Sequence, residues 1–260
     1  MRRTAFCPVG SSVIVTGAGR GIGAAAAVRL AADGLHVVAC DLDAAGLHDT
    51  RDRIVANSGS CEVLTADVTS PQDCQQVAER AASGAQPLRG LVNNAAVGAF
   101  AMDVESTTLA EWNRIIAADL TSVFLMSKVS IPLIRAAGGG VIVNVSSVHA
   151  YATSPAVAPY AAAKGGVLAL TRTMALDLAV DSIRVMALVP GAVDTPMLQS
   201  HAEREGKSLA ELGFPSGPNA IARIADPEEI AGTIAFLLSR DATFMTGSAL
   251  VADGGMLAKF

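Results

Sequence analysis

The stretch that decides the fold is "TGAGRGIG", residues 16–23, which follows the β-branched run "SVIV" and opens the Ala-rich segment "AAAAVRLAADG". Glycines let a backbone turn tightly and approach a pyrophosphate, and the N-terminus of the next helix stabilises the phosphate charge. A glycine-rich turn by itself can also reflect only close packing of a strand on a helix. Because strand, turn and helix come here in the order that nucleotide binding requires, the stretch predicts a dinucleotide site.

Outward from this turn, short apolar runs alternate with longer segments rich in Ala and Leu. The further strand candidates are "HVVAC", "CEVLTA", "RGLVNN", "GVIVNVSS", "IRVMALV" and "SALVAD". The apparent ends of the first four strands are evenly spaced, at Thr16, Asp41, Asp67 and Asn93. Continuous apolar strands imply a sheet that is covered on both faces. We therefore expect an α/β, three-layer, doubly wound fold with a central, mostly parallel, seven-stranded sheet.

Helix starts and loops complete this expectation. Ser70 before Pro71 and Asp226 before Pro227 each place a capping side chain ahead of a proline, which predicts two helix N-termini. From about residue 196 to 220 the periodicity is lost and Gly and Pro gather, which predicts a mobile lid. With 260 residues, of which 51% are hydrophobic, a single domain over 1–260 fits best.

Composition and charge exclude several classes of protein. With a net charge of −5 and no cluster of Lys and Arg, the chain lacks the electrostatic footprint of nucleic-acid binding. No secretion signal is visible, and the most apolar stretch, residues 122–134, is interrupted by Lys128 and Pro132, so we expect no membrane span. The four cysteines form no C-x-x-C pair, which predicts no metal site and reduced thiols in a cytoplasmic protein.

Two charged side chains bear on the choice of nucleotide. Asp41 follows the second strand, where a carboxylate accepts hydrogen bonds from a ribose diol and repels a 2′-phosphate, so it favours NAD over NADP. Arg20 favours the opposite choice, because a guanidinium inside the glycine turn can meet a 2′-phosphate. The alternative for Asp41 is that it only caps the following helix.

Four motifs occur in a fixed order: the Thr-Gly-x-x-x-Gly-x-Gly turn, "NNAA" at 93–96, Tyr160-x-x-x-Lys164 and "PGAVDTP" at 190–196. Together, and across nearly the whole chain, they resemble the short-chain dehydrogenase/reductase family. The resemblance implies a Rossmann fold, a nicotinamide cofactor, a small alcohol or ketone as substrate and often a homotetramer.

Tyr160 and Lys164 lie four residues apart on a predicted helix, so their side chains share one face and can point into one cavity. A nearby cation favours the phenolate, and we expect it to lower the pKa of Tyr160 from about 10 toward neutrality. By resemblance, Lys164 also binds the ribose hydroxyls and Ser147 is the third catalytic residue, which donates a hydrogen bond to the substrate oxygen. Ser146 is the alternative candidate for this catalytic role, and only the spacing to Tyr160 favours Ser147.

The resemblance also assigns the cofactor contacts. The first set comes from the turn and the second strand: Gly17, Gly19, Arg20, Gly21, Ile22, Gly23, Asp41 and Leu42. Asp67 and Val68 match an adenine-binding pair, although an aspartate after a strand often only forms a turn. The ribose side is expected to involve Asn93, Asn94, Ala95 and Ala96, together with Tyr160 and Lys164. The nicotinamide amide is expected to meet Pro190, Gly191, Val193 and Thr195.

One position departs from the family pattern. Members usually have an asparagine, which holds a water in the proton relay to the lysine, where this chain has Asp119. A carboxylate accepts the same hydrogen bonds but cannot donate, and if buried it would bind Lys164 more strongly. We therefore count Asp119 among the catalytic residues and expect an altered pH dependence or a weaker activity. Met186 also replaces an asparagine, which we expect to change packing rather than chemistry.

The expected reaction is hydride transfer between NAD(H) and a secondary alcohol or ketone of moderate size. Its apolar pocket is predicted from Val97, Ala99, Phe100, Met197, Leu198, Leu212 and Phe214. His149 and Tyr151 either line this pocket or are bystanders. One alternative is an NADP-dependent reductase of 3-oxoacyl chains on acyl carrier protein, which a basic patch near the pocket mouth would favour. The other is a nucleotide-binding scaffold with little catalysis, which only Asp119 supports. Segments 105–136 and 155–179 are the expected helical interfaces of an oligomer.

Overall fold

The computed structural model describes residues 6–98, 102–204, 206, 208–209, 220–221 and 223–258. In chain order the strands are β1 (Ser12–Thr16), β2 (His36–Asp41), β3 (Ser60–Thr65), β4 (Leu88–Asn93), β5 (Gly140–Val145), β6 (Ile183–Pro190) and β7 (Ala249–Ala252). The α-helices are α1 (Gly21–Ala32), α2 (Ala44–Ala56), α3 (Pro71–Ser83), α4 (Leu109–Ile116), α5 (Ser122–Ala136), α6 (Ala158–Leu178), α7 (Pro196–Arg204) and α8 (Pro227–Leu238). A π-helical turn, Ala117–Thr121, joins α4 to α5, and a short 3-10 turn, η2 (Val148–Ala150), follows β5.

The strands form one sheet in the order β3-β2-β1-β4-β5-β6-β7, and every strand pair in it is parallel. The prediction of a doubly wound fold is confirmed, with a sheet that is entirely rather than mostly parallel. The chain leaves β1 toward β2 on one side and reaches β4 on the other, so loops diverge at the carboxyl ends of these two neighbours. Such a divergence opens a crevice in this class of fold.

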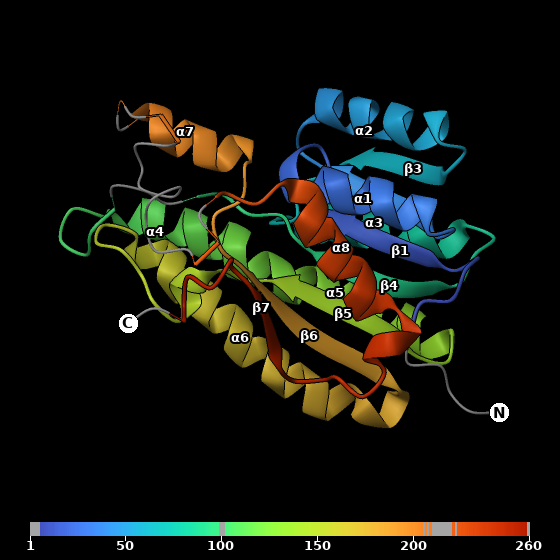
Figure 1. The fold of residues 1–260 in the computed structure, drawn as a ribbon. Coiled ribbons are helices and arrows are strands. Elements are labelled where there is room, and N and C mark those ends of the chain that lie inside the picture. The colour runs from blue at the N-terminus through green and yellow to red at the C-terminus, as the bar shows by residue number, and fades with distance from the viewer. Residues whose placement is uncertain are drawn as a thin grey trace.

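Helices cover both faces of the sheet, which gives three layers (Figure 1). On one face α1 packs between α2 and α8, and side chains such as Leu30 and Ile234 join the sheet in one core cluster. On the other face Val77 of α3, Met126 of α5 and Met174 of α6 belong to a second cluster. Burial on both faces explains why the central strands read as continuous apolar runs, since all residues of β5 and β6 are buried.

The predicted helix starts are confirmed. The Ser70 side chain accepts a hydrogen bond from the backbone N–H of Asp73, and Asp226 forms a reciprocal capping box with Glu229. These contacts satisfy backbone donors that have no partner inside the helix.

The apolar stretch around Pro132 behaves differently from the expectation. Pro132 lies inside α5 without ending it, so helical structure runs from Leu109 to Ala136 and is, by length and composition alone, long and apolar enough to cross a membrane. Met126 and Ile134 on this stretch are fully buried in the cluster that also holds side chains of α3 and the sheet. The stretch is therefore packed as a core helix of the domain.

Candidate active site

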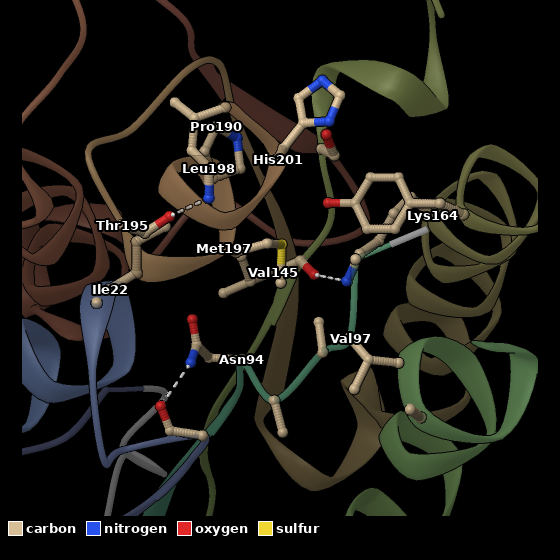
Figure 2. Close-up of a pocket in the computed structure, with 18 of the residues that line it drawn as sticks. Ile22, Asn94, Val97, Val145, Lys164, Pro190, Thr195, Met197, Leu198 and His201 are labelled. Carbon is tan, nitrogen blue, oxygen red and sulfur yellow. Dashed lines mark hydrogen bonds between the residues drawn. The ribbon is translucent and has the colours of Figure 1, made fainter. Parts of the chain in front are cut away.

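A cavity of about 1020 Å³ opens at the carboxyl ends of the strands, where the fold predicts a binding crevice. Figure 2 shows Ile22 and Thr195 on one side of it and Lys164 and Val97 on the other. Most of the predicted site residues line it: Gly17, Arg20, Gly21, Ile22, Asp41, Leu42, Asp67, Val68, Asn94, Ala95, Ala96, Ser147, Tyr160, Lys164, Pro190, Gly191, Val193 and Thr195. Residues from seven separate loops and helices thus meet around one space.

The glycine turn fits a bound pyrophosphate. Gly17 and Gly21 have φ values of +65° and +55°, a left-handed conformation that favours glycine. The next helix, α1, has no side-chain cap at its start and no acidic residue in its first turn. No side chain therefore accepts a hydrogen bond from its first backbone N–H groups, which lie at the cavity. This is the donor set that an anionic phosphate requires.

Two of the predicted turn contacts, Gly19 and Gly23, do not line the cavity. A Cβ on Gly23 would lie 2.0 Å from the carbonyl oxygen of Gly17, so this glycine lets α1 pack against the turn. The backbone N–H of Gly19 donates to Asp41 Oδ2 at 2.8 Å, which ties the turn to β2. Both glycines therefore shape the turn rather than face the ligand space.

Asp41 lines the cavity and does not cap the following helix. Its Oδ2 accepts from Gly19 and its Oδ1 accepts from the N–H of Asp43 at 2.9 Å. Asp43 is the N-cap of α2, and its side chain accepts from Gly46. Each Asp41 oxygen keeps acceptor capacity, because a carboxylate oxygen offers two lone pairs. A ribose diol therefore still has an acceptor at this end of the cavity.

The "NNAA" segment divides between the cavity and the core. The side chain of Asn94 donates to the carbonyl oxygens of Thr16 and Gly17, which fixes β4 against the turn. Asn93 was wrongly predicted to face the ribose: its buried amide donates to Ser127 Oγ and to Asn144 Oδ1 at 2.8 Å. Successive side chains of a strand point to opposite faces of the sheet, and this alternation turns the Asn93 side chain into the protein interior.

Asp67 forms a turn and lines the cavity, and its contact with an adenine stays a prediction. Its Oδ1 accepts from the backbone N–H and the hydroxyl of Thr69, which is the geometry of a turn former. The residue also lines the cavity together with Val68.

Tyr160, Lys164 and Ser147 come together at the junction of β5 and α6. Their side chains are nearly buried, and Lys164 Nζ lies 5.5 Å from the centre of the Tyr160 ring. The ammonium donates to the carbonyl oxygen of Val145 at 3.3 Å (Figure 2). Ser147 hydrogen-bonds Tyr160, whereas the hydroxyl of Ser146 donates to the backbone carbonyl of Lys164 at 2.8 Å. Ser146 thus fastens α6 to β5, and Ser147 is the serine that meets the phenol.

The pKa of Tyr160 moves in the opposite direction from the expectation. Burial raises it, and this effect outweighs the neighbouring Lys164 ammonium, which lowers it. The Asp119 carboxyl adds a further upward contribution, and the hydrogen bond from Ser147 a small downward one. The prediction of a net lowering was wrong because it counted the cation and not the loss of water around the phenol.

Asp119 lies in the π-helical turn and is fully buried. Its Oδ1 accepts from the N–H of Val97 at 2.7 Å, and its Oδ2 lies 3.6 Å from Lys164 Nζ. Burial raises the pKa of this carboxyl, although the Lys164 ammonium and the Val97 N–H oppose the rise. The Asp119 carboxyl and the Tyr160 phenol therefore both interact with the Lys164 ammonium, and Asp119 does so from outside the cavity. Extra residues in π-turns often accompany functional sites.

The predicted substrate pocket is partly described. Val97, Met197 and Leu198 line the cavity, whereas Ala99, Phe100, Leu212 and Phe214 lie outside the described residues. His149 also lines the cavity, and its ring meets the edge of Tyr160 at 5.6 Å between centroids. Tyr151 is exposed and does not line it. The predicted lid begins as α7, and most of its remainder lies outside the described residues.

Sequence reasoning missed three basic residues of the cavity wall, namely Arg114, His201 and Arg204. Arg114 belongs to α4 and the other two to α7, which are distant from the strand ends in sequence. His201 and Arg204 are three residues apart and so share a helix face. This spacing was the only feature of the sequence that could have indicated their common place in the cavity wall. Among the residues that the structure describes, no group of three His, Cys, Asp or Glu side chains is placed to hold a metal ion.

Comparison with known proteins agrees with this geometry. A family model described as enoyl-(acyl carrier protein) reductase matches residues 17–257. Cyclohexanol dehydrogenase of Acinetobacter sp. (strain SE19) is 36% identical, with 95% of this chain and 94% of that protein aligned. Cyclopentanol dehydrogenase of Comamonas sp. (strain NCIMB 9872) is 35% identical over 95% of this chain and 96% of its own.

The fold is equally close to solved structures. A crystal structure of levodione reductase superposes with a TM-score of 0.91 at 30% identity, covering 97% of this chain and 99% of that chain. Sequence identity above 30% over nearly the full length of both chains, a matching family model and the parallel seven-stranded sheet all agree. The chain therefore belongs to the short-chain dehydrogenase/reductase family, enzymes that act on CH–OH groups with a nicotinamide cofactor.

Proposed function

We propose that this protein is an NAD(H)-dependent dehydrogenase of a cyclic secondary alcohol and its ketone, with Ser147, Tyr160 and Lys164 as its catalytic residues. The observation that carries the proposal is the meeting of these three side chains in one cavity with the uncapped start of α1. The named activities of the relatives on cyclohexanol and cyclopentanol support a ring alcohol as substrate.

When bound, the nicotinamide supplies or accepts the hydride. The chain provides the rest. In oxidation the Tyr160 phenolate takes the hydroxyl proton of the alcohol, and in reduction the phenol returns it to the carbonyl oxygen. Ser147 donates a hydrogen bond to that oxygen, and the ammonium of Lys164 favours the phenolate against the cost of burial. Asp41 and the turn at Gly17 and Gly21 are the residues that would hold the nucleotide.

We expect the purified protein to bind NADH more tightly than NADPH, because the Asp41 carboxylate repels a 2′-phosphate. Asp41→Asn should then strengthen NADPH binding by about tenfold or more, equivalent to about 1.4 kcal/mol. Fluorescence titration of the two reduced cofactors measures both Kd values.

The matched control is Asp49→Asn, which removes the same charge from an exposed position of α2 outside the cavity. It should leave both Kd values unchanged. A wild-type preference for NADPH would contradict the role given to Asp41 and show that Arg20 decides the choice. That result would move the acyl-carrier reductase ahead, an alternative that the basic side chains of Arg114 and Arg204 in the cavity wall also favour.

A screen at 340 nm against cyclic alcohols and ketones tests the reaction itself. Turnover that Tyr160→Phe removes would support the dehydrogenase. Cofactor binding without turnover of any alcohol or ketone would overturn the dehydrogenase and favour the nucleotide-binding scaffold.

Asp119→Asn should move the rise of the oxidation rate to lower pH. The Asp119 carboxyl raises the pKa of Tyr160, so a neutral amide removes that contribution and lets the phenol ionise at lower pH. Oxidation requires the ionised phenol, and kcat/KM should therefore reach half of its plateau at a lower pH than in the wild type. A pH profile of the oxidation rate across the neutral and alkaline range measures this.

Asp177→Asn provides the control, because this carboxylate is exposed on α6 and outside the cavity. Its pH profile should match that of the wild type. If Asp119→Asn also leaves the rate and its pH profile unchanged, Asp119 has no part in the proton chemistry.

A homotetramer in the cytoplasm completes the proposal. Leu109 and Leu176 are more than two thirds exposed and Phe124 is about half exposed, on the helical segments from which the interfaces were predicted. Apolar side chains of this size on a helix surface favour burial against another copy of the chain.

A further inference from the structure

Charge is distributed unevenly along the cavity. Its acidic side chains lie at or just after the ends of β2 and β3, at the nucleotide end: Asp41, Asp43 and Asp67. The remainder, on η2, α4, α6 and α7, is lined by basic side chains and by no carboxylate among the described residues: Arg114, His149, Lys164, His201 and Arg204. The chain as a whole carries a net charge of −5, so this concentration of positive groups is local. Asp119 balances Lys164 from behind and does not line the cavity.

Arg114 reaches the cavity from α4, one turn before Ala118, which also lines it. The Thr108 hydrogen bonds lower the pKa of Glu111, and the Arg114 guanidinium adds to that lowering. Burial raises the pKa of Asp119, and Arg114 is the weakest of the groups that oppose the rise. Glu111 is held by the cap of α4, where its carboxylate accepts from the backbone and the hydroxyl of Thr108. Within the described parts of the chain, Arg114 forms no ion pair.

Arg204 reaches the cavity from α7. Met197, Ser200, His201 and Arg204 all line the cavity, and their spacing places them on one face of this helix. Burial lowers the pKa of His149, and the nearby His201 lowers it further. The ring of His149 meets Tyr160, so this face of α7 lies at the catalytic end. Arg204 likewise enters no ion pair with another residue that the structure describes.

Arg114 and Arg204 line the same cavity, and neither forms an ion pair with a carboxylate that the structure describes, so both are available to bind an anion. A guanidinium binds a carboxylate through two parallel hydrogen bonds. Val97, Met102 and Leu198 add apolar side chains to the lining of the same cavity. We propose that the substrate is a secondary alcohol whose ring or chain carries a carboxylate, and that Arg114 and Arg204 bind this carboxylate. The proposal rests on the dehydrogenase function proposed above.

The test compares two substrates that differ only in charge. 4-Hydroxycyclohexanecarboxylate and its carboxamide have nearly the same shape, and each is supplied as cis and trans isomers with NAD. We expect the wild type to prefer the carboxylate by about tenfold or more in kcat/KM, because a charge-assisted hydrogen bond to one arginine suffices for that ratio. The preference should fall as salt is added, since both arginines are exposed.

Arg114→Gln and Arg204→Gln should each reduce the carboxylate-to-carboxamide ratio toward 1, mainly through a higher KM for the carboxylate. Arg29→Gln removes the same charge from an exposed position of α1 outside the cavity and should keep the wild-type ratio. The Kd for NADH is measured for every variant, because a loss confined to NADH binding would show that the arginines serve the cofactor instead and would overturn the proposal.

The remaining outcomes separate the two proposals. Turnover of cyclohexanol or the carboxamide as fast as the carboxylate overturns the carboxylate site and leaves the dehydrogenase standing. The protein could instead reduce a 3-oxoacyl chain only when the chain is attached to acyl carrier protein, and lose this activity in the arginine variants. That result overturns the carboxylate site and shows that the arginines bind an acidic protein partner. Turnover of no alcohol or ketone, with intact NADH binding, overturns both proposals.

Discussion

Tyr160→Phe is expected to lower kcat by about 10²- to 10⁴-fold, the range that a positioned acid–base group contributes. The substitution removes one oxygen and keeps the ring, so the edge contact with His149 and the apolar packing around the ring remain. The affinity for NADH should stay close to that of the wild type, because Lys164 still donates to Val145 and the glycine turn is unchanged. Steady-state rates with the best alcohol of the panel, together with the Kd for NADH, measure the effect.

The chain offers a matched control, because it has only one other tyrosine. Tyr151→Phe removes the same oxygen from an exposed side chain outside the cavity and should keep the wild-type rate. A Tyr160→Phe enzyme that retains more than a tenth of the wild-type kcat would show that another group or water moves the proton. In that case the function of this cavity would need a different acid.

Gly23→Ala is expected to lower the free energy of unfolding by about 3 kcal/mol and to abolish detectable NADH binding. The added Cβ would lie 2.0 Å from the carbonyl oxygen of Gly17 and 2.5 Å from the amide nitrogen of Asn94. Both contacts are far inside van der Waals distance, and the first is with backbone, so the turn and α1 must separate. The separation would break the hydrogen bonds that Asn94 makes to Thr16 and Gly17. Urea unfolding and fluorescence titration with NADH measure the two losses.

Gly232→Ala tests whether any glycine-to-alanine change in a helix has this effect. Gly232 lies inside α8, which packs on α1, and a Cβ there would meet only the end of the Arg29 side chain at 3.7 Å. Alanine should therefore stabilise the helix by about 0.5–1 kcal/mol and leave NADH binding unchanged. Equal stability of Gly23→Ala and the wild type would contradict the close approach of α1 to the turn.

The sequence predicted the sheet and its ligand edge because both depend on local signals. The apolar runs that became β5 and β6, the turn at 16–23 and the caps at Ser70 and Asp226 are each readable from a few neighbouring residues. Parallel pairing then follows, since helices between the strands return the chain to the same edge. The meeting of Tyr160 with Ser147 was predicted from family spacing and agrees with the geometry.

What the sequence did not predict depends on contacts between distant segments. The inward amide of Asn93 needs Asn144 and Ser127 as partners, and the raised pKa of Tyr160 needs the depth of its burial. A π-turn gives no pattern that distinguishes it from an ordinary helix, so the π-turn that carries Asp119 was not readable, although the resemblance had placed Asp119 near Lys164. Arg114 is likewise brought to the cavity only by the packing of its helix.

The bond from the Ser146 hydroxyl to the backbone of Lys164 has a consequence for redesign of the enzyme. Together with the bond from Asn144 to Thr171, it joins α6 to β5, so the helix that carries Tyr160 and Lys164 is held by hydrogen bonds to an inner strand of the sheet. The outer walls come instead from α4 and α7. Libraries randomised on those two helices should therefore yield variants with new substrate preferences. The rate of the chemical step in these variants should stay close to that of the wild type.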